Sequence, residues 1–88
     1  MSQFDKLLMK LLRGGSEASF AFDDLRHILG KLGFDERIRG SHHMFDPDGI
    51  PELINIQRQG KDAKAYQVRD VRNLIVRYHL AGESDEQV

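Results

Sequence analysis

The stretch GFDERIRGSHHMF, residues 33–45, decides the fold class, because the spacing of its apolar residues changes there from helical to alternating. In residues 34–39, successive side chains would point to opposite faces of a strand. Only Gly40-Ser41 separates this run from the next one, at residues 42–45, as in a tight β-hairpin. The stretch therefore predicts two antiparallel strands joined by a short turn.

Two helices are predicted before the hairpin. Residues 4–12 carry an apolar stripe at helical spacing, which ends at Gly14-Gly15. Residues 22–32 carry a second stripe, for which Gly33 is the natural stop. The first helix is expected to be short, and residues 14–19 are expected to form a connector.

A third strand and a third helix are predicted after the hairpin. Residues 46–49 have the composition of a turn, and residues 52–57 alternate again, with Ile54 and Ile56 on one face. Residues 59–64 are expected to form a loop before a long final helix. The apolar stripe of that helix consists of Val68, Val71, Leu74, Ile75 and Tyr78.

This order predicts an α+β fold with helices packed on one face of a three-stranded antiparallel sheet, because no simpler arrangement buries all the apolar stripes. The other face of the sheet is left open. We divide the chain into an N-terminal helix and linker at residues 1–15, a domain at 16–80, and an acidic, flexible tail at 81–88.

Size and composition limit what such a chain can do. With 88 residues, 40% hydrophobic and 31% charged residues and a net charge of -1, it fits one globular domain with a thin core, so any chemistry must lie near the surface. No apolar run approaches the roughly 18 residues of a membrane span, and the first residues lack the features of a signal peptide. The absence of cysteine excludes disulfides and thiolate metal sites. We therefore expect a cytoplasmic protein.

The charge is unevenly distributed along the chain. Residues 58–80 contain six cations and two carboxylates, a local balance of +4. Either a solvated helix face or a surface that binds a polyanion would produce this pattern. Within the segment, Lys61 and Lys64 precede the final helix, where ammonium groups and a helix N-terminus can bind phosphate together. Arg69 begins a polar stripe along the same helix.

The adjacent histidines at 42 and 43 are the best candidates for acid–base chemistry near neutral pH. Strand neighbours point to opposite faces, so if Phe45 enters the core, His43 shares its side and His42 projects from the open face. The two rings cannot then bind one metal ion. Gly40 would allow close approach of a phosphate, and Ser41 offers a hydroxyl donor. The alternative is that His42 is an exposed imidazole with no chemical role.

Five motifs of the chain form a combination that is familiar: LGKLGF (29–34), RGSHHMF (39–45), LINIQ (53–57), GKDAK (60–64) and YQVR (66–69). Together they resemble the HicA toxin family of bacterial toxin–antitoxin systems, over about residues 22–80. The added helix at residues 4–12 is absent from the shortest family members, and Ala65 stands where related sequences often carry a proline.

The resemblance implies a fold like the double-stranded RNA-binding domain and an endoribonuclease that cleaves messenger RNA. It also implies a HicB-like antitoxin protein as inhibitor, and His42 as the catalytic residue. We expect no metal or other cofactor, and RNA contacts from Arg39, Gly40, Ser41, Lys61, Lys64 and Arg69. The competing hypotheses are a non-catalytic RNA-binding module, which would use the same lysines, and a protein-interaction domain.

Overall fold

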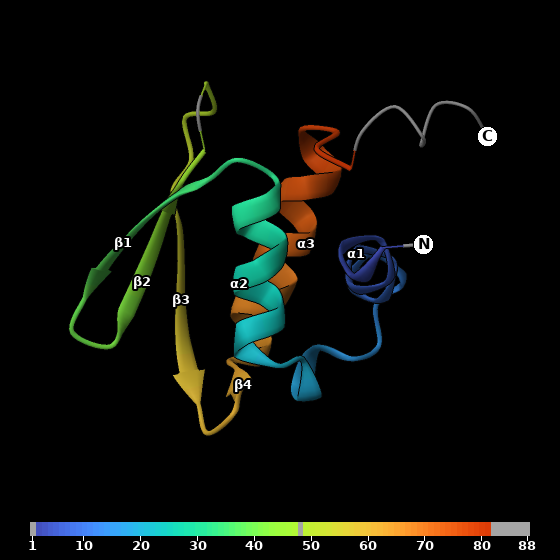
Figure 1. Ribbon diagram of the computed structural model, residues 1–88, viewed down its shortest axis with the longest axis horizontal. Coiled ribbons are helices and arrows are strands. Elements are labelled where there is room, and N and C mark those ends of the chain that lie inside the picture. The colour runs from blue at the N-terminus through green and yellow to red at the C-terminus, as the bar shows by residue number, and fades with distance from the viewer. Residues whose placement is uncertain (1, 48, 82–88) are drawn as a thin grey trace.

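The computed structural model describes residues 2–47 and 49–81. The described chain is α+β, as predicted, and Figure 1 shows the sheet on one side and the helices on the other. Position 48 of the predicted turn and residues 82–88 of the predicted tail lie outside the described residues. In chain order the elements are α1 (Gln3–Arg13), the 3-10 helix η1 (Glu17–Ser19), α2 (Phe22–Lys31), β1 (Asp35–Arg39), β2 (His42–Asp46), β3 (Ile54–Gln59), β4 (Asp62–Ala63) and α3 (Ala65–Arg77).

The sheet is antiparallel in the order β1-β2-β3-β4, so the prediction of three strands was wrong by one strand. β4 lies inside the segment that the sequence predicted to be a loop. Its two residues are too few to show alternation, and contacts distant in the chain hold it. Ala63 N donates to Phe20 O at 2.9 Å, and Phe22 N donates to Lys61 O at 3.0 Å. The connector before α2 therefore extends the sheet at this edge.

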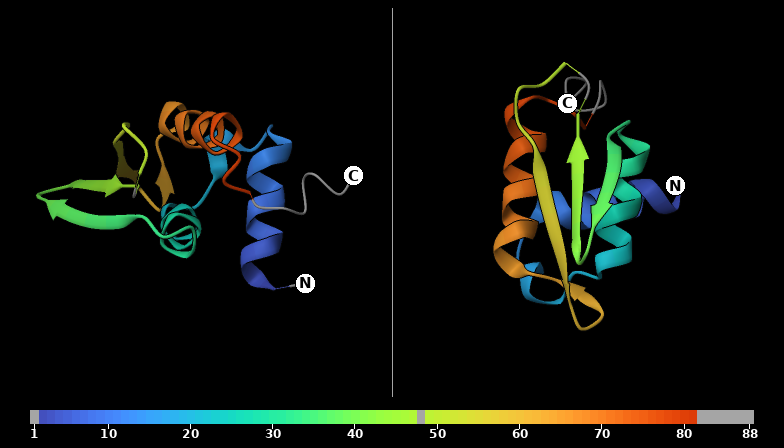
Figure 2. Two further views of the ribbon diagram at one scale, coloured as in Figure 1. Left: turned by 90° about the horizontal axis from the view of Figure 1, so that it is seen from above. Right: turned by 90° about the vertical axis from the view of Figure 1, so that its left-hand side faces the viewer.

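The helices form two layers rather than one. α2 and α3 cover one face of the sheet, as predicted, whereas α1 packs on their far side (Figure 2, left). The prediction that all helices lie on the sheet was wrong for α1, because its stripe of Leu7, Leu8 and Leu11 is buried against the other two helices. Arg72 Nε also donates to Leu12 O at 3.0 Å and ties the end of α1 to α3.

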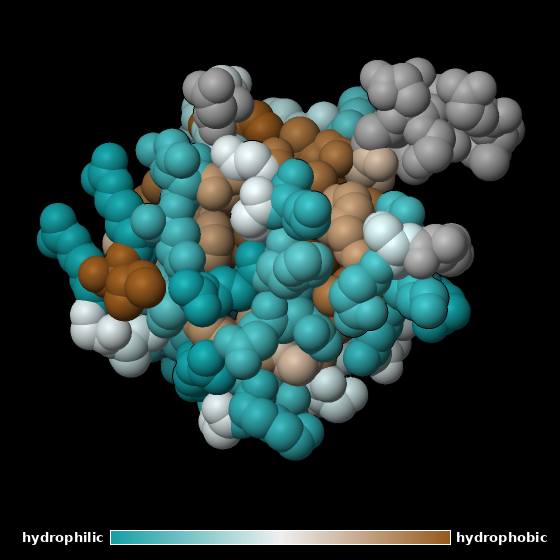
Figure 3. Space-filling model, in the orientation of Figure 1, coloured by the Kyte–Doolittle hydropathy of each residue, from teal (hydrophilic) through white to brown (hydrophobic). Residues whose placement is uncertain are grey.

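The end of α2 sets where the sheet begins. Gly33 has φ +95°, and Phe34 N donates to Leu29 O at 3.1 Å, which closes the helix as a Schellman motif and turns the chain into β1. β1 is the outer strand. Its Ile38 is 56% exposed, and Figure 3 shows a hydrophobic patch among hydrophilic side chains at this edge. The strand therefore extends beyond the cover of the helices.

The core lies between the sheet and the α2–α3 layer. Its central side chains are fully buried and come from both sides of this contact. The helices contribute Phe22, Val71 and Ile75, and the strands contribute Phe45 and Ile56. In the described part of the chain, no helix combines the length and the apolar character needed to span a bilayer.

Candidate functional site

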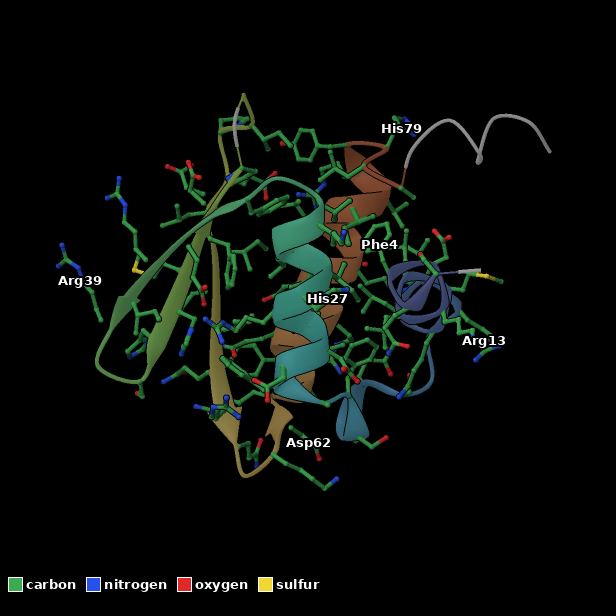
Figure 4. The ribbon with its side chains drawn as sticks, viewed as in Figure 1. Phe4, Arg13, His27, Arg39, Asp62 and His79 are labelled. Carbon is green, nitrogen blue, oxygen red and sulfur yellow. The ribbon has the colours of Figure 1, made fainter. Side chains whose placement is uncertain are left out.

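His42 projects from the open face of the sheet, and His43 points toward the helices. The pairing register places Arg39, His42 and Gln57 side by side across β1, β2 and β3. The neighbouring row is Ile38, His43 and Ile56, and Ile56 is fully buried. Arg39 extends away from the sheet on the same side as His42 (Figure 4). The predicted orientations of the two histidines are therefore correct.

Two amide side chains of β3 contact the His42 ring. His42 Nδ1 lies 3.4 Å from Asn55 Oδ1 and 3.3 Å from Asn55 Nδ2, and His42 Nε2 lies 3.5 Å from Gln57 Nε2. These are long contacts, so the ring is oriented without being locked. Gln57 presents its donor Nε2–H₂ to His42 Nε2, and Asn55 Oδ1 can accept from Nδ1–H, so these contacts favour the tautomer with the proton on Nδ1.

Gln57 links His42 to Lys64. Gln57 Oε1 accepts from Lys64 Nζ at 3.2 Å, so one amide contacts both the imidazole and the ammonium group. Gln67 of α3, which is 3% exposed, holds the backbone of Gln57 in place, because Gln57 N donates to Gln67 Oε1 at 2.7 Å. Gln67 Nε2 in turn donates to Tyr66 Oη at 3.3 Å. The fold thus brings two of the predicted site residues, His42 and Lys64, to the nitrogen and the oxygen of one amide group.

His43 has a structural environment. Its Nδ1 lies 2.7 Å from Glu36 Oε2, and its ring meets that of Phe22 edge-on with 4.8 Å between centroids. Arg26 donates to both oxygens of the same carboxylate, at 2.6 and 3.0 Å. The Arg26 guanidinium, and then His43, hold the pKa of Glu36 below its usual value. These contacts of Glu36 and His43 with Arg26 and Phe22 therefore hold β1 and β2 against α2.

Gly40-Ser41 and Lys61, which were predicted to contact RNA, lie in two hairpin turns. Gly40 (φ +58°) and Ser41 join β1 to β2, and Gly60 (φ +66°) and Lys61 join β3 to β4. A glycine with positive φ at the first central position is what a two-residue hairpin of type II′ requires. The turns therefore explain these glycines without any ligand, and Gly40 and Ser41 lie exposed at the tip beside Arg39 and His42.

The other two cations that were predicted to bind RNA, Lys61 and Arg69, do not lie around His42. The Lys61 side chain is 88% exposed and lies 3.7 Å from Asp62 Oδ1. Arg69 lies on the part of α3 that faces η1, where its charge contributes to lowering the pKa of Glu17, after backbone hydrogen bonds. The other three cations of the basic segment are engaged within the chain: Arg58 with Asp23, Arg72 with Leu12 O, and Arg77 with Glu52.

Sequence reasoning missed three contributors to the open face. Arg37 precedes Arg39 by two residues and pairs with Met44, so it stands on the same face as His42. Asn55 and Gln57 were assigned to a strand but given no role. The period-2 pattern of β1 and β3 contained this signal, because residues two apart in a strand share a face.

Comparison with known proteins identifies no relative: no protein-family model, no curated protein and no solved structure matches the chain. Within residues 2–47 and 49–81, no three histidine, aspartate or glutamate side chains form a set that could hold a metal ion.

Proposed function

We propose that this protein is a small endoribonuclease, the toxin of a type II toxin–antitoxin system, which cleaves messenger RNA and thereby inhibits translation and growth. The observation that carries the proposal is the arrangement of His42, Gln57 and Lys64 on an exposed sheet face that also bears Arg39. It combines a base, an orienting amide and cations, which are the groups that RNA cleavage by transesterification needs.

In the proposed mechanism His42 acts as general base. With Nδ1–H donating to Asn55 Oδ1, the Nε2 lone pair faces only the long contact of 3.5 Å from Gln57 Nε2, and a ribose 2′-hydroxyl that replaces this contact can give its proton to Nε2. The 2′-oxygen then bonds to the adjacent phosphorus, the bond from phosphorus to the 5′-oxygen breaks, and that oxygen takes a proton from the imidazolium or water. Lys64 and Arg39 stabilise the charge on the phosphoryl oxygens. The products are a 2′,3′-cyclic phosphate and a 5′-hydroxyl.

RNA binding in this proposal depends on few cations. Arg37, Arg39 and Lys64 flank His42, and none of them forms an ion pair with a described carboxylate. Three phosphate contacts on single-stranded RNA correspond to a slope of about -2 for log K against log salt, at about -0.7 for each contact. Arg37→Gln should reduce the slope by about 0.7, and a flat salt dependence would contradict this surface.

The proposed inhibitor is a HicB-like antitoxin that covers the open face. Arg37 and Arg39 favour an acidic partner surface there, because opposite charges complement each other across an interface. We also propose a fold like that of the double-stranded RNA-binding domain, because α2, the first three strands and α3 follow its order of elements, with α1 and β4 as additions. A nuclease of messenger RNA would act in the cytoplasm.

The deciding experiment compares induced expression of wild type, His42→Ala and His27→Ala. His27 is exposed on α2, away from the open face, and so provides a matched control (Figure 4). We expect wild type and His27→Ala to arrest growth and to leave RNA fragments with 2′,3′-cyclic phosphate ends, and His42→Ala to lose at least about 100-fold in cleavage. Equal effects of all three, at equal abundance, would instead favour a non-catalytic RNA-binding or protein-interaction module.

A further inference from the structure

A polar groove of about 330 Å³ lies between β3 and α3, next to His42. Viewed toward the open face, α3 runs alongside β3, the strand that carries the His42 contacts (Figure 2, right). β4 pairs only with Arg58 and Gln59, so the rest of this side of β3 is not covered by a strand. Asn55 lines the groove and also contacts the His42 ring, which joins the two sites through one side chain.

The groove contains side chains suited to hold a flat, polar ring. Tyr66, which lines the groove, is 50% exposed and offers an aromatic face. Asp70 and Asn73 lie one turn apart on α3, are exposed, and enter no hydrogen bond or ion pair with the described residues. An aromatic face with free hydrogen-bonding groups is how proteins hold unstacked RNA bases.

Only one carboxylate in the groove is available to a ligand. Glu52 accepts from Tyr78 Oη at 2.6 Å and from Arg77 Nη1 at 2.8 Å, and these bonds, with that of Tyr78 the larger effect, lower its pKa. Asp70 has no such partner among the described residues. An ionised carboxylate is acceptor-only, so it selects a ligand edge with hydrogen-bond donors and repels one that presents acceptors.

We propose that this groove binds a guanine base of the RNA and thereby selects the cleavage site, an inference that rests on the proposed nuclease function. Guanine is the one common base whose Watson–Crick edge presents two neighbouring donors, N1–H and N2–H₂, and these match the two oxygens of Asp70. The Asn73 amide can donate to guanine O6, and Tyr66 can stack on the ring. A base held there lies one side chain, Asn55, from the proposed catalytic imidazole.

The test is a nuclear magnetic resonance titration of the ¹⁵N-labelled full chain with each of the four nucleoside 3′-monophosphates. We expect the guanosine nucleotide to shift the signals of Tyr66, Asp70 and Asn73 and to bind about 5- to 150-fold more tightly than the others. Asp70→Asn should abolish this preference. Asp35→Asn, which makes the same change at an exposed position on the opposite edge of the sheet, should retain it.

Equal binding of the four nucleotides, shifts outside the groove, or an unchanged preference in Asp70→Asn would overturn the inference. Tyr66→Leu provides a second variant, which should weaken all four nucleotides alike because stacking is indifferent to the base. His42→Ala separates the two proposals. Guanosine preference together with cleavage that does not need His42 would remove the nuclease mechanism and leave the groove, whereas His42-dependent cleavage without guanosine preference would do the reverse.

Discussion

Replacing Gln67 with leucine should destabilise the protein by about 2 kcal/mol, although the two side chains are similar in size. Gln67 is the one buried polar residue in the described part of the chain. Its Oε1 accepts from Gln57 N at 2.7 Å and so occupies the place of a neighbouring strand where β4 does not reach. Leucine would leave that partly buried N–H without a partner, which costs about 1–3 kcal/mol.

Urea denaturation followed by circular dichroism measures this loss. For a protein of this size the free energy of unfolding falls by about 1 kcal/mol per molar urea, so the midpoint of Gln67→Leu should fall by about 2 M. Gln67→Glu should also destabilise the protein at neutral pH, because it buries a charge and places a second acceptor oxygen against Gln57 Oε1, to which Gln67 Nε2 donates. Gln59→Leu, at an exposed position of β3, is the control and should stay within about 0.5 kcal/mol of wild type. A Gln67→Leu midpoint equal to that of the control would refute the proposed backbone role of Gln67.

Two further predictions concern stability. Glu36→Gln should cost about 1 kcal/mol at pH 7. Arg26, and then His43, lower the pKa of Glu36 in the folded protein, so the stabilisation by Glu36 is complete above its usual pKa of 4.5 and disappears as pH falls through the folded pKa. The urea midpoints of wild type and Glu36→Gln should therefore converge below pH 4.5. A difference between the two midpoints that stays the same at every pH would contradict this linkage. His79→Gly should stabilise the folded protein by about 1 kcal/mol, because His79 follows the C-cap of α3 with φ +55°, a conformation that favours glycine. A thermal midpoint that does not rise in this variant would contradict the prediction.

The sequence predicted the elements whose pattern is local. The change of period at Gly33 and the two-residue turn at Gly40-Ser41 located β1 and β2 within one residue, because a helix stop and a tight hairpin are both specified by neighbouring residues. β4 and the position of α1 escaped prediction for the opposite reason. Both depend on partners distant in the chain, such as the bond from Ala63 N to Phe20 O, and no local pattern records them.

The candidate site divides in the same way. The orientation of His42 followed from the alternation of a strand, and the structure agrees. The link from His42 through Gln57 to Lys64 could not be predicted, because it requires the register of β2 against β3 and the reach of a side chain from the start of α3. The orientation of side chains along a single strand could thus be predicted from the sequence. Contacts between side chains of different elements could be identified only in the structure.

Charge counting shows why the basic segment was a poor guide to the surface. Its balance of +4 allowed either a solvated helix face or a polyanion site, and in the structure Arg58, Arg72 and Arg77 are held by Asp23, a backbone carbonyl and Glu52. A cation held by the fold has already given up part of its hydration and its counterion, so it offers little to a phosphate. Arg37 and Arg39, on a strand with two carboxylates and no excess of charge, point outward beside His42. The number of unpaired cations on one face, rather than the net charge of a segment, should therefore govern affinity for RNA.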